Sequence, residues 1–303
     1  MNKDLILGTA LWGWKVEESE CFKILDYFYD NKFNKIDLAT NYPINYDINS
    51  FRLSETIVEK WIKKNNVNDL KLIIKIGSID NSGSTYNNLN YDSILKNFEY
   101  YSKKFKNNLW NIMIHWDNRN DKKKIIETIG ALKVIKNQNI NIGLSGIKYM
   151  KIYSRVLFEN NLIPLIECKH NIFDSYVTTY KEYFPSNQIY VYGINLGGLN
   201  LSNIYDNKSS ISLRGIDTSK YENFLEKLNE IINKYKSKLT FKIKTLNQIS
   251  FIEISFNKNI NGLIIGPSSL TQMIDSVSDY NFILKENINN FIFENIIKEL
   301  NYN

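Results

Sequence analysis

Four side chains in this sequence have the chemical types that proton transfer to a carbonyl oxygen requires: a carboxylate, a phenol, an amine and an imidazole. They are Asp37, Tyr42, Lys75 and His115, which occur in the segments IDLATNY, LIIKIG and IMIHWD. Each lies at or just beyond the end of a short apolar run. His115 is one of only 2 histidines in 303 residues, which makes an accidental placement less plausible. We therefore take these four as candidate catalytic residues.

The four side chains have complementary roles. A free phenol has a pKa of about 10, which is too high for efficient acid–base catalysis at neutral pH. The ammonium of Lys75 would favour the phenolate of Tyr42 and lower that pKa, and Asp37 would keep Lys75 charged and fixed. His115 could donate a hydrogen bond to the substrate oxygen. Each residue alone has an ordinary structural explanation, so the functional interpretation depends on finding all four at one end of adjacent strands.

Eight short runs rich in isoleucine, leucine and valine alternate with amphipathic segments along the whole chain, as expected for strands covered on both faces. The expected strands are Leu5–Thr9, Lys35–Leu38, Leu72–Ile76, Trp110–His115, Ile140–Ser145, Pro164–Cys168, Ile189–Gly193 and Gly262–Gly266. Eight strand–helix units in about 300 residues are typical of an α/β (β/α)8 TIM barrel, in which chemistry collects where the strands end. The segment Gly8–Gly13 lacks the glycine-rich dinucleotide turn of a doubly wound sheet. The sequence therefore predicts the barrel.

Additional helices refine this barrel. Two helices, Ser219–Tyr235 and Leu246–Phe256, are expected between the seventh and eighth strands, where a plain barrel has one, and a further helix, Ile288–Leu300, follows the eighth unit. The irregular segment 196–218 is long enough to be a lid or a binding loop. Because no linker or repeat interrupts the pattern, we predict one domain over residues 1–303.

Composition excludes several classes of protein. The net charge of +6 comes from dispersed lysines without a nucleic-acid-binding motif, so we expect no nucleic-acid partner. Cys21 and Cys168 show no disulfide or metal-ligand spacing, and no metal is expected. No apolar run reaches membrane-spanning length. We expect a cytoplasmic protein that makes no membrane contact and is a monomer or a weak homo-oligomer.

From the first strand to about Ser276 the chain resembles the aldo-keto reductases. LGTALWGW resembles the first strand of the bacterial branch that begins with LGTA, IDLATNY keeps the Asp-x4-Tyr spacing, and LIIKIG and IMIHWD supply the lysine and histidine of the catalytic tetrad. The segments GLSGI, ECKHNIFDS and GLIIGPSSLTQMIDS resemble the fifth strand, the sixth strand and the cofactor segment. The resemblance implies that an aldehyde or ketone is reduced to an alcohol by hydride from NADPH or NADH, with Tyr42 as proton donor.

The resemblance also implies which residues hold the cofactor. The implied cofactor-binding residues are Gly8, Thr9, Asp37, Ser145, Glu167, Asn195, Gly198, Gly266, Ser268, Gln272 and Asp275. Of these, Gln272 and Asp275 would face the adenosine end, and the glycine turn at Gly266 leads into a helix N-terminus that suits phosphate. Four aromatic residues flank the catalytic ends of strands and are expected to line the substrate pocket: Trp12, Trp14, Phe51 and Trp116.

Several positions depart from the pattern of the family. Gly146 stands where asparagine is usual, Glu167 where glutamine is usual, and Ser276 where asparagine is usual. A carboxylate at position 167 could accept from the NH2 of the nicotinamide carboxamide but could not donate to its carbonyl. No arginine or lysine occurs between Gly266 and Asp279, where a clamp for the 2′-phosphate of NADP is often found. The choice between NADP and NAD therefore stays open.

Two alternative functions remain possible on the same barrel. One is a catalytically weak or inactive nucleotide-binding or scaffold protein, which the departures at the cofactor positions keep open. The other is a lyase in which Lys75 forms a Schiff base with the substrate, although the paired Asp37 favours a lysine that stays charged. The short polar segment Asp117–Lys124 after the fourth strand favours a hydrophilic carbonyl substrate such as a sugar.

Overall fold

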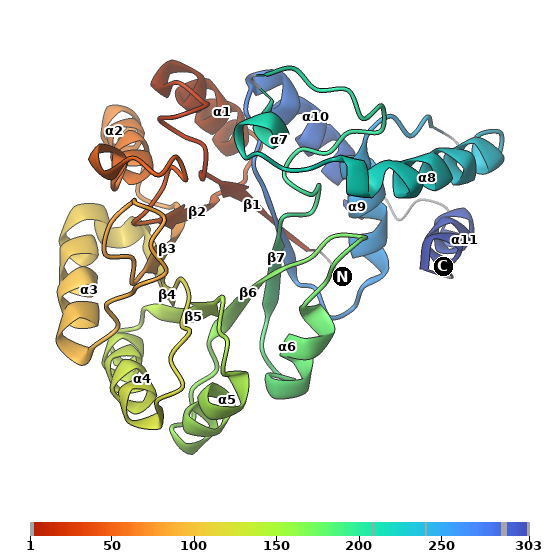
Figure 1. The fold of residues 1–303 in the computed structure, drawn as a ribbon. Coiled ribbons are helices and arrows are strands. Elements are labelled where there is room, and N and C mark those ends of the chain that lie inside the picture. The colour runs from red at the N-terminus through yellow and green to blue at the C-terminus, as the bar shows by residue number, and fades with distance from the viewer. Residues whose placement is uncertain (1–2, 208, 240, 286–289, 302–303) are drawn as a thin grey trace.

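The computed structural model describes residues 3–207, 209–239, 241–285 and 290–301. Its strands form a closed barrel in the order β1 to β8, and every neighbouring pair is parallel (Figure 1). The predicted TIM barrel is confirmed, and every predicted strand end lies within one residue of the observed end. The strands are β1 Asp4–Gly8, β2 Lys35–Ala39, β3 Lys71–Ile76, β4 Leu109–Ile114, β5 Asn141–Ser145, β6 Leu165–Lys169, β7 Ile189–Tyr192 and β8 Gly262–Ile265.

The helices surround the barrel (Figure 1). They are α1 Glu18–Asp30, α2 Leu53–Asn65, α3 Tyr91–Phe105, α4 Lys122–Asn137, α5 Met150–Glu159, α6 Val177–Tyr183, α7 Ser210–Leu213, α8 Glu222–Tyr235, α9 Leu246–Phe256, α10 Leu270–Tyr280 and α11 Asn290–Asn301. Shorter turns are η1 Ile48–Ser50, η2 Lys106–Asn108, η3 Ser219–Tyr221 and η4 Asn281–Lys285. Apolar side chains at a spacing of three and four residues give helices such as α3 one buried face, which packs on the strands.

The connection from β7 to β8 contains both predicted helices, α8 and α9, and α11 follows α10. Residue Ile288, where the last helix was expected to begin, lies outside the described residues. The expectation of an irregular segment over 196–218 is wrong in one respect, because the segment contains α7. This single turn is capped by the Ser209 side chain, which accepts from the Ser212 N–H. Four residues are too few to show helical periodicity in the sequence.

A mainly apolar layer of side chains lies inside the barrel. It is formed by Ile6, Ile73, Met113, Leu165, Tyr190 and Ile264. Because side chains alternate between the two faces of a strand, residues two positions further along the same strands point the same way. Lys75 follows Ile73 in this way, and Glu167 follows Leu165. Ionisable side chains therefore follow this apolar layer toward the carboxyl ends of the strands.

No helix in the described part of the chain is both long and apolar enough to cross a lipid bilayer. The thiols of Cys21 and Cys168 are free and buried.

Candidate active site

Lys75 and Asp37 form a buried ion pair at the carboxyl end of the barrel. The Lys75 Nζ lies 2.5 Å from both carboxylate oxygens of Asp37, and both side chains are almost fully buried. Asp37 is the middle residue of β2, not a residue at its end, so the sequence interpretation placed it too late. Burial alone would lower the pKa of Lys75, but the adjacent carboxyls of Asp37 and Glu167 raise it well above its ordinary value. Lys75 is therefore a fixed cation.

Tyr42 lies in the turn after β2, beside this cation. The Lys75 Nζ is 5.1 Å from the centroid of the Tyr42 ring. Burial raises the pKa of Tyr42 to about 12, while Lys75 acts in the opposite direction. The expectation that Lys75 lowers this pKa is thus right for the direction of its effect and wrong for the net result, because burial dominates. At neutral pH the phenol keeps its proton and can donate it.

His115 directly follows β4 and lies on the other side of the phenol. Its ring centroid is 5.9 Å from that of Tyr42 and 4.7 Å from that of Trp116. Burial, with a smaller effect of Lys75, holds the pKa of His115 well below its ordinary value. The Nδ1 atom is buried and has no hydrogen-bond partner among the described residues. A neutral imidazole is therefore available to a ligand oxygen beside Tyr42.

Glu167 on β6 is a second carboxyl group next to Lys75. It is fully buried, and its Oε2 atom lies 3.3 Å from Lys75 Nζ. Burial, followed by the charge of Asp37, raises the pKa of Glu167 to about 8, and Lys75 acts in the opposite direction. The sequence interpretation assumed a carboxylate that cannot donate. This upward shift of the pKa instead favours the protonated acid, which could donate a hydrogen bond.

Several implied cofactor residues lie around this cluster. The Thr9 hydroxyl donates to the Asp37 carbonyl oxygen at 2.8 Å, and Gly8 pairs with Asp37 across the β1–β2 ladder. Ser145 pairs with Glu167 across β5 and β6. Gly146 has a φ of +52°, and a Cβ there would lie 3.0 Å from the His115 carbonyl oxygen. This close approach gives a structural reason for glycine at position 146.

In the turn before α10, backbone N–H groups that could bind phosphate already donate hydrogen bonds to side chains of the protein. The Ser268 N–H donates to the Gln272 Oε1 at 2.8 Å, and the Leu270 N–H donates to the Glu20 Oε1 of α1 at 2.7 Å. Gly266 and Asp275 are exposed nearby. Phosphate binding at this turn stays a prediction, and it would require the side chains of Gln272 and Glu20 to move or to share their donors.

Asn195 and Gly198 lie in the turn after β7, where the Gly198 N–H donates to the Asn195 carbonyl at 3.0 Å. The chain beyond this turn is held to the β1–α1 loop, because the Lys15 Nζ donates to the Ser210 Oγ at 2.9 Å. This contact places the segment 194–218 beside the loop that follows the first strand. The two implied cofactor residues stay predictions.

The four aromatic residues expected in the substrate pocket do not share one environment. Trp116 is beside His115, and its Nε1 donates to the Thr85 carbonyl. Trp14 and Phe51 are half-buried, whereas Trp12 is 1% exposed and belongs to the hydrophobic core. The Trp116 ring thus contacts a member of the candidate tetrad, and the burial of Trp12 suits packing.

Two residues near the site were missed by sequence reasoning. Tyr192 ends β7. Burial raises its pKa to about 12; Lys75 lowers this pKa and Tyr42 raises it further. Arg214 follows α7; burial lowers the pKa of its guanidinium, and Tyr42 acts in the opposite direction. The position of Tyr192 at a strand end could have revealed it. Nothing local in the sequence marks Arg214, because a long connection brings it near the tetrad.

Buried polar atoms without partners gather at the carboxyl ends of the strands. They include Thr40 Oγ1, Asn41 Oδ1, Ser78 Oγ, His115 Nδ1 and Glu167 Oε1. Buried polar atoms normally have hydrogen-bond partners, so this concentration indicates a place for a polar ligand. The amide, hydroxyl and phosphate groups of a nicotinamide dinucleotide could supply such partners, and the residues present therefore fit that cofactor.

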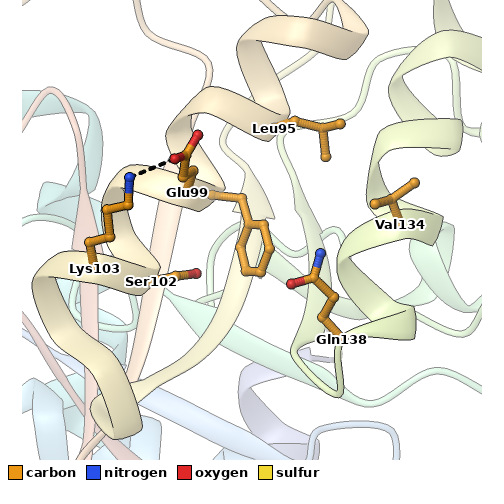
Figure 2. A pocket seen from close by; sticks show the side chains of 7 residues that line it. Leu95, Glu99, Ser102, Lys103, Val134 and Gln138 are labelled. Atoms are coloured by element: carbon orange, nitrogen blue, oxygen red, sulfur yellow. Dashed lines mark hydrogen bonds and ion pairs between the residues drawn. The ribbon is translucent and has the colours of Figure 1, made fainter.

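A separate hollow lies on the outer helical layer, between α3 and α4 (Figure 2). It is lined by Leu95, Phe98, Glu99, Ser102, Lys103, Val134 and Gln138. The one ion pair drawn there joins Lys103 to Glu99 at 2.6 Å, and both side chains are exposed. None of these residues comes from a strand end, so the hollow is no part of the candidate active site. In the described part of the chain no group of three His, Cys, Asp or Glu side chains could hold a metal ion.

Comparisons with known proteins agree with the fold. A solved glycerol dehydrogenase from Gluconobacter oxydans has the same fold, with a TM-score of 0.72 and 18% identity over 98% of this chain and 90% of that one. An uncharacterized 11.2 kDa protein of Pseudescherichia vulneris is 37% identical over 57 residues, which are 19% of this chain and 55% of that protein. The sequence pattern of the aldo/keto reductase family matches residues 4–287. The chain therefore belongs to the aldo/keto reductase family of oxidoreductases, which act on carbonyl and alcohol groups.

Proposed function

We propose that this protein reduces an aldehyde or ketone to an alcohol with NADH or NADPH, and that Tyr42 donates the proton. The observation that carries the proposal is the arrangement around the phenol. On one side lies the buried Lys75–Asp37 pair, with Nζ 5.1 Å from the ring centroid, and on the other a neutral His115 ring at 5.9 Å. A proton donor, a cation that makes it more acidic and a neutral hydrogen-bonding group are thus collected in one place.

Each residue has a separable task in this proposal. A nicotinamide dinucleotide held at this site would supply the hydride that the carbonyl carbon needs. His115 and the Tyr42 hydroxyl hold the carbonyl oxygen, and that oxygen takes the proton from Tyr42 Oη as negative charge develops on it. Lys75 stabilises the resulting phenolate, and Asp37 fixes the ammonium in position. Solvent then returns a proton to Tyr42.

The test is the Tyr42→Phe variant, which removes the hydroxyl and keeps the ring. We expect its turnover with an accepted aldehyde to fall by at least about 100-fold, since loss of general acid catalysis costs about that much. Nicotinamide dinucleotide binding, measured by tryptophan fluorescence, should change little. Wild-type turnover in the variant would overturn the proposal. Tight binding without turnover by the wild type on a broad carbonyl panel would support a scaffold protein instead.

A Schiff-base lyase has less support. Nucleophilic attack by Lys75 needs a neutral amine, and such lysines have a lowered pKa. The carboxyls of Asp37 and Glu167 outweigh burial and raise the pKa of Lys75 well above its ordinary value. Borohydride trapping with a carbonyl substrate should therefore leave Lys75 unmodified.

For the cofactor we propose a preference for NADH over NADPH. The family resemblance places the adenosine end at the start of α10. There the Glu20 carboxylate accepts the Leu270 N–H at 2.7 Å, and this bond lowers the pKa of Glu20. The same carboxylate also pairs with Lys23 of α1 at 3.1 Å, and the Lys23 side chain is exposed. The carboxylate at this turn would disfavour a 2′-phosphate, and no arginine or lysine occurs between Gly266 and Asp279.

For the substrate we propose a hydrophilic carbonyl compound, such as a sugar or an acidic derivative. Arg214 supports this. Its guanidinium forms no hydrogen bond or ion pair with any described residue, and it is close enough for Tyr42 and Tyr46 to act on its pKa, which burial lowers. An unpaired cation beside the proton donor suits an oxygen-rich or anionic substrate. A strong preference for long apolar ketones in a substrate screen would exclude this proposal.

A further inference from the structure

The buried cluster at the barrel mouth contains two carboxyl groups but one cation. Asp37 projects from β2, Lys75 from β3 and Glu167 from β6, and all three residues are at most 3% exposed. If both carboxyls were ionised, one negative charge would remain buried without compensation. Such a charge is costly, and buried carboxyls usually avoid it by keeping a proton.

The other groups that face Glu167 supply no second cation. On its own strand Cys168 is a neutral thiol, because burial raises its pKa to about 12. From β7, Tyr190 and Tyr192 face it as neutral phenols, since burial raises both pKa values. Tyr42 is also neutral, and the low pKa of His115 leaves that imidazole uncharged. Neutrality of the cluster therefore requires one protonated carboxyl.

The geometry decides which carboxyl keeps the proton. Both oxygens of Asp37 lie 2.5 Å from Lys75 Nζ, whereas Glu167 offers Oε2 alone at 3.3 Å. Burial raises the pKa of Asp37 as well, and Lys75 acts against this. With both oxygens on the ammonium, Asp37 is the better partner and is the carboxyl that we take as ionised. Because Oε2 of Glu167 accepts from Lys75, the proton is placed on Oε1. That atom is buried and has no partner among the described residues.

We propose that Glu167 works as a neutral carboxylic acid whose Oε1–H donates a hydrogen bond to the carbonyl oxygen of the nicotinamide carboxamide. The proposal rests on the proposed function for the identity of the ligand. A protonated acid can donate a hydrogen bond, as the NH2 of an amide side chain would at this position, whereas a carboxylate cannot. Loss of the proton would replace the donor by a negative charge facing the carboxamide oxygen and would weaken binding.

The first test measures thermal unfolding of the protein without added cofactor, at pH 5 and pH 9, for the wild type and Glu167→Gln. Folding raises the pKa of Glu167 from 4.5 to about 8. The folded protein then binds more protons than the unfolded chain between these values, so wild-type stability falls as pH rises through about 8. Glutamine does not titrate. The quantity compared is the melting temperature of Glu167→Gln minus that of the wild type at the same pH. We expect this difference to be about 5 °C more positive at pH 9 than at pH 5.

The matched control for this test is Glu99→Gln on α3. Glu99 is exposed, and its hydrogen bond with Lys103 lowers its pKa, so it titrates below pH 5. Its melting temperature relative to wild type should be the same at pH 5 and pH 9. If Glu167→Gln behaves like this control, Glu167 does not hold a proton and the inference is wrong, whatever the protein's catalytic activity.

The second test measures NADH binding by fluorescence at pH 7 and pH 9. If only the protonated acid binds, the dissociation constant of the wild type should rise about 10-fold, because a group with a pKa near 8 is about 10% protonated at pH 9. Glu167→Gln should keep a dissociation constant within about twofold across this range. Equal pH dependence in both proteins would overturn the role of Glu167 as donor. No binding at any pH would overturn the donor role and the proposed function together, while the unfolding test would still decide the protonation state.

Discussion

At the scale of single residues, burial controls the chemistry of the site. Burial raises the pKa values of Tyr42 and Glu167 and lowers that of His115, while the carboxyls around Lys75 raise the pKa of that lysine. In the proposed function these shifts provide a proton donor, a neutral orienting group and a fixed cation.

Glu20 is the residue on which the proposed preference for NADH can be tested. In Glu20→Ala the carboxylate at the start of α10 is lost and the Leu270 N–H is freed. We expect the ratio of NADPH to NADH dissociation constants to fall by roughly 5- to 10-fold, about 1–1.4 kcal/mol, because a repulsive charge near the 2′-phosphate has been removed. Fluorescence titration with both cofactors measures it. Glu17→Ala, at the residue that precedes α1, is the control, and an unchanged ratio in Glu20→Ala would contradict the proposal.

At the scale of elements, the connection after β7 has the largest part in completing the site. It carries Arg214 toward Tyr42, and the Lys15–Ser210 hydrogen bond holds it against the loop after β1. Strand–helix units of the barrel position the tetrad rigidly. In the connection after β7, the side chains of Leu196 and Ile211 belong to the hydrophobic core, and the Lys15–Ser210 hydrogen bond adds a polar contact at the start of α7.

The contribution of the Lys15–Ser210 hydrogen bond can be tested with Ser210→Ala. The substitution removes the acceptor of the partly buried Lys15 ammonium, a hydrogen bond worth about 1–2 kcal/mol. We expect limited proteolysis within 194–218 to be roughly 5-fold faster or more, with little change in the melting temperature of the barrel, since only the local opening free energy falls. Ser154→Ala on α5, where the hydroxyl bonds locally to the Lys151 carbonyl, should cleave like wild type. Unchanged cleavage in Ser210→Ala would show that other contacts hold the segment.

At the scale of the whole molecule, closure of the barrel depends on the seam between β1 and β8. Lys3, which is 6% exposed, lies at this seam and donates to the carbonyls of Asn257 and Ile260, both at 2.8 Å. These bonds join the start of β1 to the chain that leads into β8. They satisfy two carbonyl groups that the barrel ladder does not use.

Replacing Lys3 by methionine keeps the apolar stem and removes both charge-assisted bonds. We expect the free energy of unfolding to fall by about 2–4 kcal/mol, because two carbonyl groups lose their donor. Urea denaturation measures this loss. The exposed Lys96 of α3 provides the control, and Lys96→Met should change stability by less than about 0.5 kcal/mol. A small loss in Lys3→Met would mean that strand pairing alone closes the barrel.

The sequence by itself determined the barrel, and it predicted the four residues of the candidate tetrad. Strand and helix periodicity is a local property, and parallel strands place their carboxyl ends together, so Lys75 and His115 could be located without coordinates. The assignment of residues 1–303 to one domain stays a prediction, as do the catalytic roles. Short capped elements such as α7 were missed, because one turn has no detectable period.

Only the tertiary structure decided the protonation states and the distant contacts. Whether Glu167 is an acid or a carboxylate depends on burial and on Asp37 and Lys75, which lie on two other strands. The contact of Glu20 with the start of α10 joins residues 250 positions apart in the chain. Electrostatic free energies depend on distances in space and on exclusion of water, and neither quantity is a local property of the sequence.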